Sequence, residues 1–380
     1  MVAPAPGSLF DSPRGSLVLQ RYPGRPNETL TAWSAADRLL VDSLTGALPR
    51  PETILVANDE HGALSTALGA GQMWTDSALS ARALRQNLQR NSLPGIAVAW
   101  STEPPSVATQ LVVMRVPKQL AYFEFQLATL AATMSPGTSL VAGGMDKHLS
   151  PHTAALIEHY VGPTQRHRGQ RKARLFSATF DGPQYPLPEI WRRYHCPALD
   201  AELKSLPNVF SREQLDRGSE FLLRQLPHLT LTAQDRAVDL ACGNGVLGLA
   251  ALASGLARRL VFCDESAMAL ASARENLLCV RPDDEVRCEF HHGDGLLDYC
   301  GERAGLVLCN PPFHSQHVVD DFAGRRLLAQ AAKHLEADGC LCLVANRHLK
   351  YRSVLTRSFH QVETLASNSK FIVWRASRPR

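Results

Sequence analysis

The sequence contains no long apolar run and no leader-like beginning. No stretch approaches about 18 consecutive apolar residues, the length that a membrane-spanning helix requires. The first residues, Met-Val-Ala-Pro-Ala-Pro-Gly-Ser, have neither the basic start nor the apolar segment of a secretion signal. We therefore expect no membrane contact and a cytoplasmic location.

Cysteine is missing from the first half of the chain. All nine cysteines lie at or after Cys196, and no two are spaced Cys-x-x-Cys. Zinc sites and disulfide frameworks use paired spacing, so we expect reduced thiols and no bound metal. The net charge of +4 permits an anionic partner without requiring one. A chain of 380 residues, 45% of them hydrophobic, is long enough for two domains.

A glycine-rich turn follows an apolar segment in the second half. Residues 237–248 are Ala-Val-Asp-Leu-Ala-Cys-Gly-Asn-Gly-Val-Leu-Gly, which is typical of a buried strand, a tight turn and the start of a helix. Glycines there let the backbone approach a ligand closely, although a simple strand-to-helix turn has the same pattern. We expect Asp239 to face the cationic end of a ligand, and the turn to contact it through Cys242, Gly243, Asn244 and Gly245.

Acidic residues end the two strands that follow. Asp264, with Glu265 after it, ends segment 259–263 about 20 residues beyond the glycines, where a doubly wound sheet places a carboxylate for ribose hydroxyls. Asp294 and Gly295 follow the expected strand 285–290, and Asp294 could accept a hydrogen bond from an adenine amine. Each carboxylate alone also fits a solvated strand end. Their order along the chain favours a single nucleoside-binding edge.

Asn310-Pro311-Pro312-Phe313 ends the next apolar segment, 305–309. The Asn310 amide oxygen and the Pro311 carbonyl oxygen can accept both hydrogens of a planar amine, while an aromatic ring stacks on the base that carries it. Asn-Pro-Pro also occurs in ordinary turns, because proline ends a strand. Asp239, Asp264, Asp294 and Asn310 each lie at the end of an expected strand, and the tetrapeptide is the last of the four. Together they predict methylation of an exocyclic amine. We also expect Asn310 to contact the methyl donor.

The order of these segments resembles that of class I S-adenosylmethionine-dependent methyltransferases. Segments 310–314 and 208–218 resemble the ribosomal RNA guanine-N2 methyltransferases, and segments 19–23, 262–266 and 344–349 resemble the members that act on the large subunit. The resemblance covers nearly the whole chain. It implies S-adenosylmethionine as the cofactor, 23S ribosomal RNA free of protein as the partner, and a monomeric enzyme.

An internal repeat relates the two halves, with a period of about 189 residues. Segment 77–88 aligns without gaps with segment 266–277, and both predict an amphipathic helix after an acidic strand end. Weaker matches follow in the same order along both halves. With the resemblance, the repeat predicts an α/β protein of two tandem doubly wound, Rossmann-like methyltransferase domains, each with a mostly parallel seven-stranded sheet.

The first copy lacks the residues for methyl transfer. Asn58-Asp-Glu-His-Gly62 replaces the glycine-rich turn, and Arg115, which has no acceptor, ends the strand that matches the one before Asn310. Arg115 and Lys118 could contact phosphate, or could lie at a solvated strand end. We expect a degenerate, non-catalytic RNA-binding domain over 1–175, a linker over 176–207 and the catalytic domain over 208–380.

The densest basic run lies between the halves, in segment 165–174. Arginine forks suit phosphate, so this run predicts contact with the RNA backbone, although charge runs are also common on solvated faces. The basic residues in question are Arg166, Arg168, Arg171, Lys172 and Arg174.

Other functions fit parts of the same pattern. The Asn-Pro-Pro geometry also serves small-subunit 16S rRNA guanine-N2 methylation and the methylation of glutamine N5 or adenine N6. A non-catalytic RNA-binding assembly factor is the alternative from another class. The intact segments of the second half argue against a non-catalytic assembly factor. The non-catalytic first half favours an RNA guanine target over glutamine or adenine.

Overall fold

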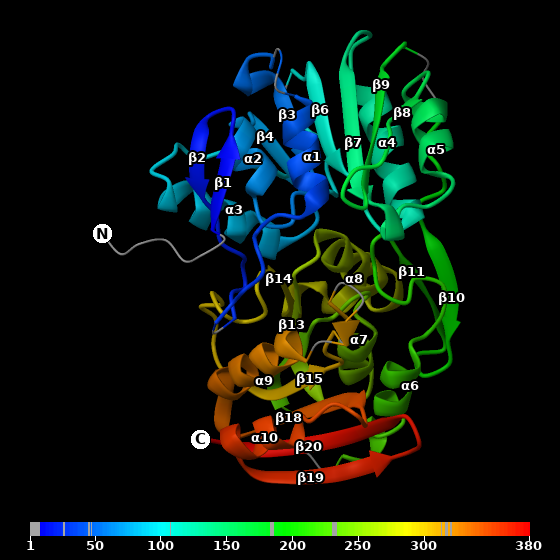
Figure 1. Ribbon diagram of the computed structural model, residues 1–380. Coiled ribbons are helices and arrows are strands. Elements are labelled where there is room, and N and C mark those ends of the chain that lie inside the picture. Colours follow the sequence, from blue (N-terminus) through cyan, green and yellow to red (C-terminus); the bar gives the residue numbers. More distant parts are fainter. Residues whose placement is uncertain are drawn as a thin grey trace. The chain divides into compact units, whose positions relative to one another are not determined.

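The computed structural model describes residues 8–380 except 26, 45, 47, 107, 183–185, 230–233, 313, 316, 317 and 320. The chain forms two compact units, Met1–Ile190 and Trp191–Arg380, and Figure 1 shows a sheet with flanking helices in each. Among the described residues, no helix combines the length and the apolar character needed to cross a bilayer.

The second unit is built on a seven-stranded sheet in which the first five strands of the spatial order run parallel and the last two are antiparallel to their neighbours. The order is β14 (Cys288–His292), β13 (Ala257–Asp264), β12 (Gln234–Leu240), β15 (Ala304–Cys309), β18 (Leu335–Asn346), β20 (Phe371–Pro379) and β19 (Phe359–Ser367). A hairpin of β10 (Arg192–Cys196) and β11 (Ala201–Ser205) precedes the sheet, and β16 (His314–Ser315) pairs with β17 (Val318–Val319) after β15.

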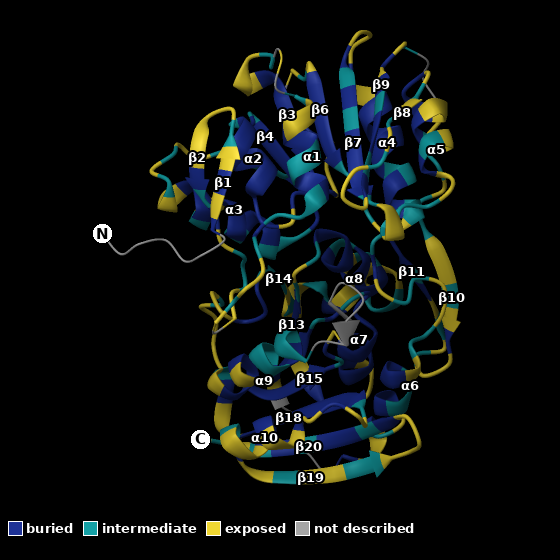
Figure 2. Ribbon diagram, viewed as in Figure 1, coloured by how far each residue is buried: buried dark blue, intermediate teal, exposed yellow. Residues whose placement is uncertain are grey.

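Helices cover both faces of this sheet, which explains why its central strands are apolar on both sides. All six residues of β15 are buried; Leu306 and Leu308 pack on one face, and Val307 and Cys309 on the other. Figure 2 shows the central strands as buried. One face carries α6 (Arg217–Leu223), α7 (Val246–Ala253) and α8 (Ala267–Val280), and the other carries α9 (Phe322–His334) and α10 (Arg352–Ser358).

The first unit repeats this topology strand for strand. Its sheet order is β5 (Ala97–Trp100), β4 (Gln72–Thr75), β3 (Ile54–Ala57), β6 (Leu111–Arg115), β7 (Ser139–Met145), β9 (Ala173–Thr179) and β8 (Gln165–Arg166). The two tandem, mostly parallel seven-stranded sheets expected from the sequence are confirmed. The remaining elements are the hairpin of β1 (Leu9–Ser12) and β2 (Gly15–Val18), and the helices α1 (Ala35–Ser43), α2 (Ala63–Leu68), α3 (Ala78–Arg90), α4 (Leu120–Thr133) and α5 (Thr153–Tyr160).

The repeat extends to the backbone of the turn after the first strand of each unit. Asn58 and Ala241 both have a positive φ, 60° and 59°, and Gly62 and Gly245 follow with φ of 73° and 83°. Left-handed conformations are rare outside glycine, so their occurrence at matching places indicates one inherited turn geometry. The two units therefore share this turn although its side chains differ.

The division of the chain differs from the expected boundaries. The expected first domain ended at residue 175, but β9 continues to Thr179, because its residues pair with β7 along the whole strand. The expected linker 176–207 also contains the hairpin β10–β11, whose Leu203 is fully buried in the core of the second unit. The hairpin packs as part of that unit, so little of this segment serves as a connection.

Candidate active site

The carboxyl ends of four neighbouring strands bring most of the predicted site together. β14, β13, β12 and β15 are parallel and adjacent, so the residues that follow them gather along one edge of the sheet. Asp239 lies in β12, Asp264 ends β13, Asp294 follows β14 and Asn310 follows β15. The parallel topology alone thus brings to one edge residues that lie up to about 70 positions apart in the sequence.

The glycine-rich turn leaves its backbone accessible at one point. Gly243 has φ of 55°, and a Cβ atom built on it would meet no other atom within 4 Å. Gly245 has φ of 83°, and its Cβ would lie 2.9 Å from the Cβ of Ala273, so this position is closed by α8. Gly243 therefore faces open space where a ligand can approach the backbone, whereas Gly245 allows the turn to pack on the helix.

Asp239 has one engaged and one unpartnered carboxylate oxygen. Its Oδ2 accepts a hydrogen bond of 2.8 Å from the Gly248 backbone N–H, while Oδ1 is buried with no partner in the described part of the chain. Burial raises the pKa of Asp239 from 3.8 to about 8, the Gly248 hydrogen bond opposes this, and nearby Asp264 adds to it. A buried carboxylate with a free oxygen is the environment that a cationic ligand group would stabilise.

Asp264 connects the ends of β12 and β13. Its Oδ2 accepts a hydrogen bond of 2.9 Å from the Gly243 N–H, and its Oδ1 accepts one of 3.0 Å from the Ser266 N–H at the start of α8. The carboxylate thus holds the glycine-rich turn against the next strand. Its neighbour Glu265 is exposed, and the carbonyl oxygen of Glu265 lies 2.9 Å from the His292 Nε2 atom.

The other residues of the turn are directed into the protein. Asn244 donates from Nδ2 to the Tyr194 hydroxyl at 2.9 Å and to Ser205 Oγ at 3.2 Å, so its side chain fixes the hairpin β10–β11 to the turn. Cys242 is buried, and burial raises the pKa of its thiol well above the usual value. The structure gives both side chains a packing role where the sequence suggested ligand contact.

Asp294 is paired with a cation that the sequence did not indicate. Its Oδ2 contacts the guanidinium of Arg326 from α9, and the Asp294 side chain is almost fully buried. Gly295, at φ of 55°, leaves no room for a Cβ, which would collide with Gln330. The expected adenine contact of Asp294 therefore competes with an ion pair inside the protein.

The amide of Asn310 is held by two residues of the segment before the sheet. Its Nδ2 donates to Asp216 Oδ2 and to Ser219 Oγ, both at 2.9 Å, while its Oδ1 is buried and has no hydrogen-bond partner among the described residues. Asp216 and Ser219 were not among the predicted site residues, although Asp216 lies in the segment 208–218 that carried the family resemblance. Of the residues after Asn310, Pro311 is buried, Pro312 is exposed, and Phe313 lies outside the described residues.

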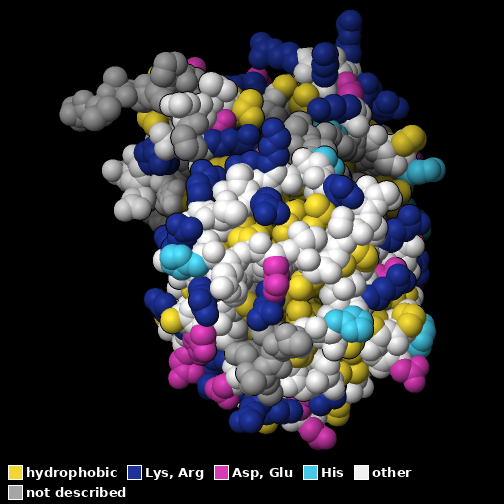
Figure 3. Space-filling model, turned by 90° about the horizontal axis from the view of Figure 1, so that it is seen from below, with side chains coloured by type: hydrophobic (Ala, Val, Ile, Leu, Met, Phe, Trp, Pro, Cys, Tyr) yellow, Lys and Arg dark blue, Asp and Glu magenta, His cyan; other side chains and the backbone are white. Residues whose placement is uncertain are grey.

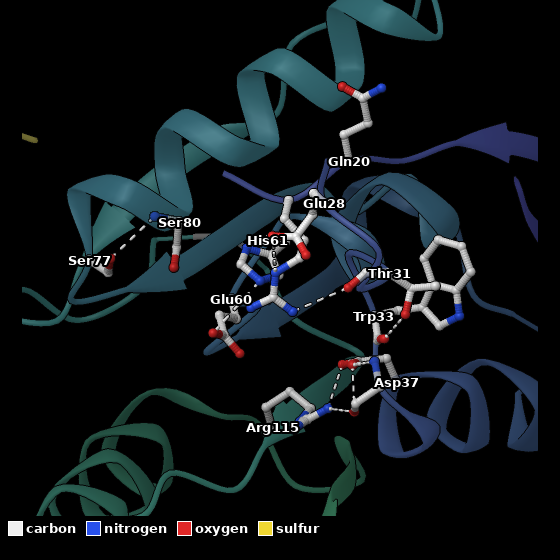
Figure 4. A network of polar contacts seen from close by, with 12 residues as sticks. Gln20, Glu28, Thr31, Trp33, Asp37, Glu60, His61, Ser77, Ser80 and Arg115 are labelled. Atoms are coloured by element: carbon white, nitrogen blue, oxygen red, sulfur yellow. Dashed lines mark hydrogen bonds and ion pairs between the residues drawn. The ribbon is translucent and has the colours of Figure 1, made fainter. Parts of the chain in front are cut away.

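The basic residues of the first unit divide into paired and exposed ones. Arg115, expected to contact phosphate, is only 19% exposed and forms contacts of 2.7 Å with Asp37 Oδ1 and Ser34 Oγ at the start of α1 (Figure 4). It stabilises the fold because a buried guanidinium needs a carboxylate partner. Arg174 pairs with Asp146 at 3.0 Å. The exposed set is Lys118, Arg166, Arg168, Arg171 and Lys172.

Basic side chains also occur on the face of the protein that Figure 3 presents. On the face that Figure 3 presents, Lys and Arg side chains are spread among uncharged and acidic ones. Burial lowers the pKa of the Lys118 ammonium, and the nearby Lys147 lowers it further while Glu60 raises it.

Two family models match the chain, the RLMG N-terminal domain at residues 8–182 and the methyltransferase small domain at residues 200–375. A protein of Alcanivorax borkumensis named ribosomal RNA large subunit methyltransferase G is 40% identical over 384 residues, which cover 97% of each chain. The protein of the same name from Pseudomonas fluorescens is 41% identical over 377 residues, 98% of this chain and 100% of the relative.

A solved structure shares the complete two-unit fold. The T. thermophilus 16S rRNA N2 G1207 methyltransferase, crystallised with AdoMet and guanosine, aligns with a TM-score of 0.77 at 23% identity over 97% of each chain. The fold likeness covers both sheets, and the sequence relatives match over almost their entire length. The resemblance seen in the sequence is confirmed, and the chain belongs to the ribosomal RNA large subunit methyltransferase G family.

Proposed function

We propose that this protein transfers a methyl group from S-adenosylmethionine to the exocyclic N2 amine of a single guanine in protein-free 23S rRNA. The observation that carries the proposal is the Asn310 amide. Its nitrogen donates two hydrogen bonds, while its buried oxygen has no partner in the part of the chain that the structure describes. An acceptor in this state suits an amine donor and disfavours a carbonyl at the same position. The relatives named as large-subunit rRNA methyltransferases support the choice of RNA.

The residues at the strand ends fit the proposed cofactor. When bound, S-adenosylmethionine supplies an electrophilic methyl group on a positively charged sulfur. The unpartnered Asp239 Oδ1 suits its ammonium group, and the open backbone at Gly243 suits close approach of its methionine part. Asp264, at the end of β13, would accept hydrogen bonds from the ribose hydroxyls while it keeps its contacts to the turn.

The protein contributes position and desolvation to the reaction. Asn310 Oδ1 and the Pro311 carbonyl oxygen would accept the two hydrogens of the guanine amine, which directs the nitrogen lone pair out of the base plane. After transfer the nitrogen is strongly acidic, so its proton can pass to water or to these oxygens without a dedicated base. The guanine must leave its base stack to reach this edge of the sheet, and we propose that it then stacks on the ring of Phe313.

The first unit is proposed to bind RNA without carrying out chemistry. At the turn that matches the glycine-rich one, Asn58 exchanges hydrogen bonds of 2.7 and 3.0 Å with Gln126 and also bonds the Arg115 carbonyl oxygen. Asp59 accepts from the Ser65 N–H at 2.7 Å. Both side chains are thus engaged by other parts of the first unit, at the place where the second unit offers open backbone. We therefore assign the first unit a contribution to RNA affinity through its exposed cations.

Identification of the methylated atom tests this function. Purified protein, labelled S-adenosylmethionine and protein-free 23S rRNA should give one methyl group per RNA, on guanine N2 after nuclease digestion and mass spectrometry. Assembled large subunits should be poor substrates, because a covered base cannot enter the site. Methylation of 16S rRNA, of adenine N6 or of a protein glutamine would contradict the proposal. We place this activity in the cytoplasm and assign it to a monomer.

A further inference from the structure

Two side chains at the start of α6 contact the nitrogen of the Asn310 amide. Asp216 Oδ2 and Ser219 Oγ both lie 2.9 Å from Asn310 Nδ2. The other atom of the amide, Asn310 Oδ1, is buried, and none of the described residues bonds to it. A serine hydroxyl can donate or accept, so it tolerates either orientation of the amide. An ionised carboxylate only accepts, so Asp216 tolerates only the orientation in which the nitrogen faces it.

Asp216 is itself held in place by the helix that it caps. The same Oδ2 atom accepts a hydrogen bond of 2.8 Å from the Ser219 backbone N–H, and Asp216 is the N-cap residue of α6. Between the two lies Gly218, where a Cβ would come within 2.9 Å of Asp216 Oδ2 and 3.6 Å of Asn310 Oδ1. The start of α6 thus presents a fixed acceptor to the amide nitrogen and keeps the space beside the amide clear.

We propose that Asp216 and Ser219 are positioning residues that hold the Asn310 amide with its oxygen directed at the amine to be methylated. This inference rests on the proposed function of Asn310. Without the carboxylate, the amide can turn over and present its –NH2 group to the substrate amine, which would place two donors face to face. The pair therefore acts on the rate of methyl transfer through Asn310, while cofactor binding at the strand ends of β12 and β13 is untouched.

Two substitutions at position 216 separate this role from helix capping. Serine is a good N-cap residue but is too short to keep the contact to Asn310, whereas asparagine caps the helix and still offers an oxygen to the amide. We expect Asp216→Ser to lower kcat on protein-free 23S rRNA about tenfold, as the loss of one charge-assisted hydrogen bond implies. Asp216→Asn should stay within about threefold of wild type.

A matched pair of serines provides the control for helix packing. Ser219 and Ser80 are each 6% exposed. Ser219 donates its backbone N–H to the Asp216 side chain that caps α6, and Ser80 donates its own to the Ser77 side chain that caps α3, a contact that Figure 4 shows. Ser219→Ala should lower kcat about threefold, and Ser219→Thr should restore it. Ser80→Ala, which lies in the first unit, should leave kcat unchanged.

Four quantities are measured for each variant: kcat, the KM for RNA, the calorimetric affinity for S-adenosylmethionine, and the Tm. For Asp216→Ser we expect kcat to fall. The KM for RNA and the affinity for S-adenosylmethionine should stay within about twofold of wild type, and the Tm within a few degrees. In the Asn310→Ala background, Asp216→Ser should change the residual rate by less than about twofold.

Other outcomes overturn the inference. Wild-type kcat in Asp216→Ser, or an equal loss in Asp216→Asn, would show that amide orientation does not limit the reaction. A parallel loss of Tm and cofactor affinity would make the contact structural. Failure of the wild-type protein to methylate guanine N2 would instead reject the proposed function, so the two failures are distinguishable.

Discussion

Asn87 and Asn276 make the same hydrogen bonds in the two units. Asn87 Nδ2 donates to the carbonyl oxygens of His61 at 2.9 Å and Gln20 at 3.0 Å, and its Oδ1 accepts from the Gln20 N–H at 2.9 Å. Asn276 Nδ2 donates to Asn244 at 3.0 Å and Lys204 at 2.9 Å, and its Oδ1 accepts from the Lys204 N–H at 2.8 Å. In each unit this asparagine connects the strand-to-helix turn with the hairpin region, at Gln20 just after β2 in the first unit and at Lys204 within β11 in the second.

Removing the two asparagines should therefore have equal structural and unequal functional effects. Asn87→Ala and Asn276→Ala should each destabilise their own unit by about 2–4 kcal/mol, because buried backbone groups lose their partners. Only Asn276→Ala should weaken S-adenosylmethionine binding, since its turn contains Gly243. Calorimetric unfolding with and without the cofactor measures both effects. Weakened cofactor binding in Asn87→Ala alone would contradict the assignment of the cofactor site.

The buried carboxylate of Asp239 predicts a pH dependence of stability. Its pKa rises from 3.8 to about 8 on folding, so the folded protein binds the proton more tightly than the unfolded chain. The associated stability is fully present below about pH 4 and is lost as the pH rises through 8, at up to about 1.4 kcal/mol per pH unit. Asp239→Asn removes this titration.

Between pH 5 and pH 9, the unfolding free energy of the wild type should therefore fall relative to that of Asp239→Asn. Comparison with the variant is needed because Asp59, whose pKa burial raises to about 6, titrates in the same direction in the first unit. Urea unfolding at several pH values provides the measurement. Parallel curves for the two proteins would mean that Asp239 is not protonated in the free protein.

Substitution of Asn310 should separate methyl transfer from cofactor binding. Asn310→Ala should lower kcat by about 100-fold or more, because the amine loses the acceptor that orients it, and should leave cofactor affinity within a few fold. Single-turnover transfer and calorimetry on the same preparation test the two parts. A near wild-type rate would remove Asn310 from the chemistry, and a large loss of affinity would place it in the cofactor site instead.

The basic residues of the first unit should fall into two functional groups. Neutralising Arg166, Arg168, Arg171 and Lys172 together should raise the KM for RNA about tenfold and flatten its salt dependence, without changing the KM for S-adenosylmethionine. Arg115→Met should instead lower stability by about 2–3 kcal/mol, because Asp37 loses its ion-pair partner. If the variant with all four substitutions kept the salt dependence of the wild type, the RNA contact would lie elsewhere.

Local pattern was sufficient to predict the framework of the protein. Continuous apolar segments such as β15 are typical of strands buried on both faces, and parallel strands place their ends along one edge whatever packs around them. Asp239, Asp264, Asp294 and Asn310 could therefore be assigned to one edge from their positions after strands. The repeat followed from sequence alone for the same reason, because equal spacing of turns and helices requires equal topology.

Partnerships between distant side chains were decided by the tertiary structure. Asp216 reaches Asn310 because the start of α6 packs beside the end of β15, and Arg115 faces Asp37 because α1 packs against the sheet of the first unit. Asn244 bonds the Tyr194 hydroxyl because the hairpin packs against the glycine-rich turn. Hydrophobic periodicity specifies which face of an element is buried, whereas the partner of a polar side chain depends on which elements meet and at what angle. The amino-acid sequence thus determined which residues meet at one edge of the sheet, and the packing of the helices determined which way the Asn310 amide points.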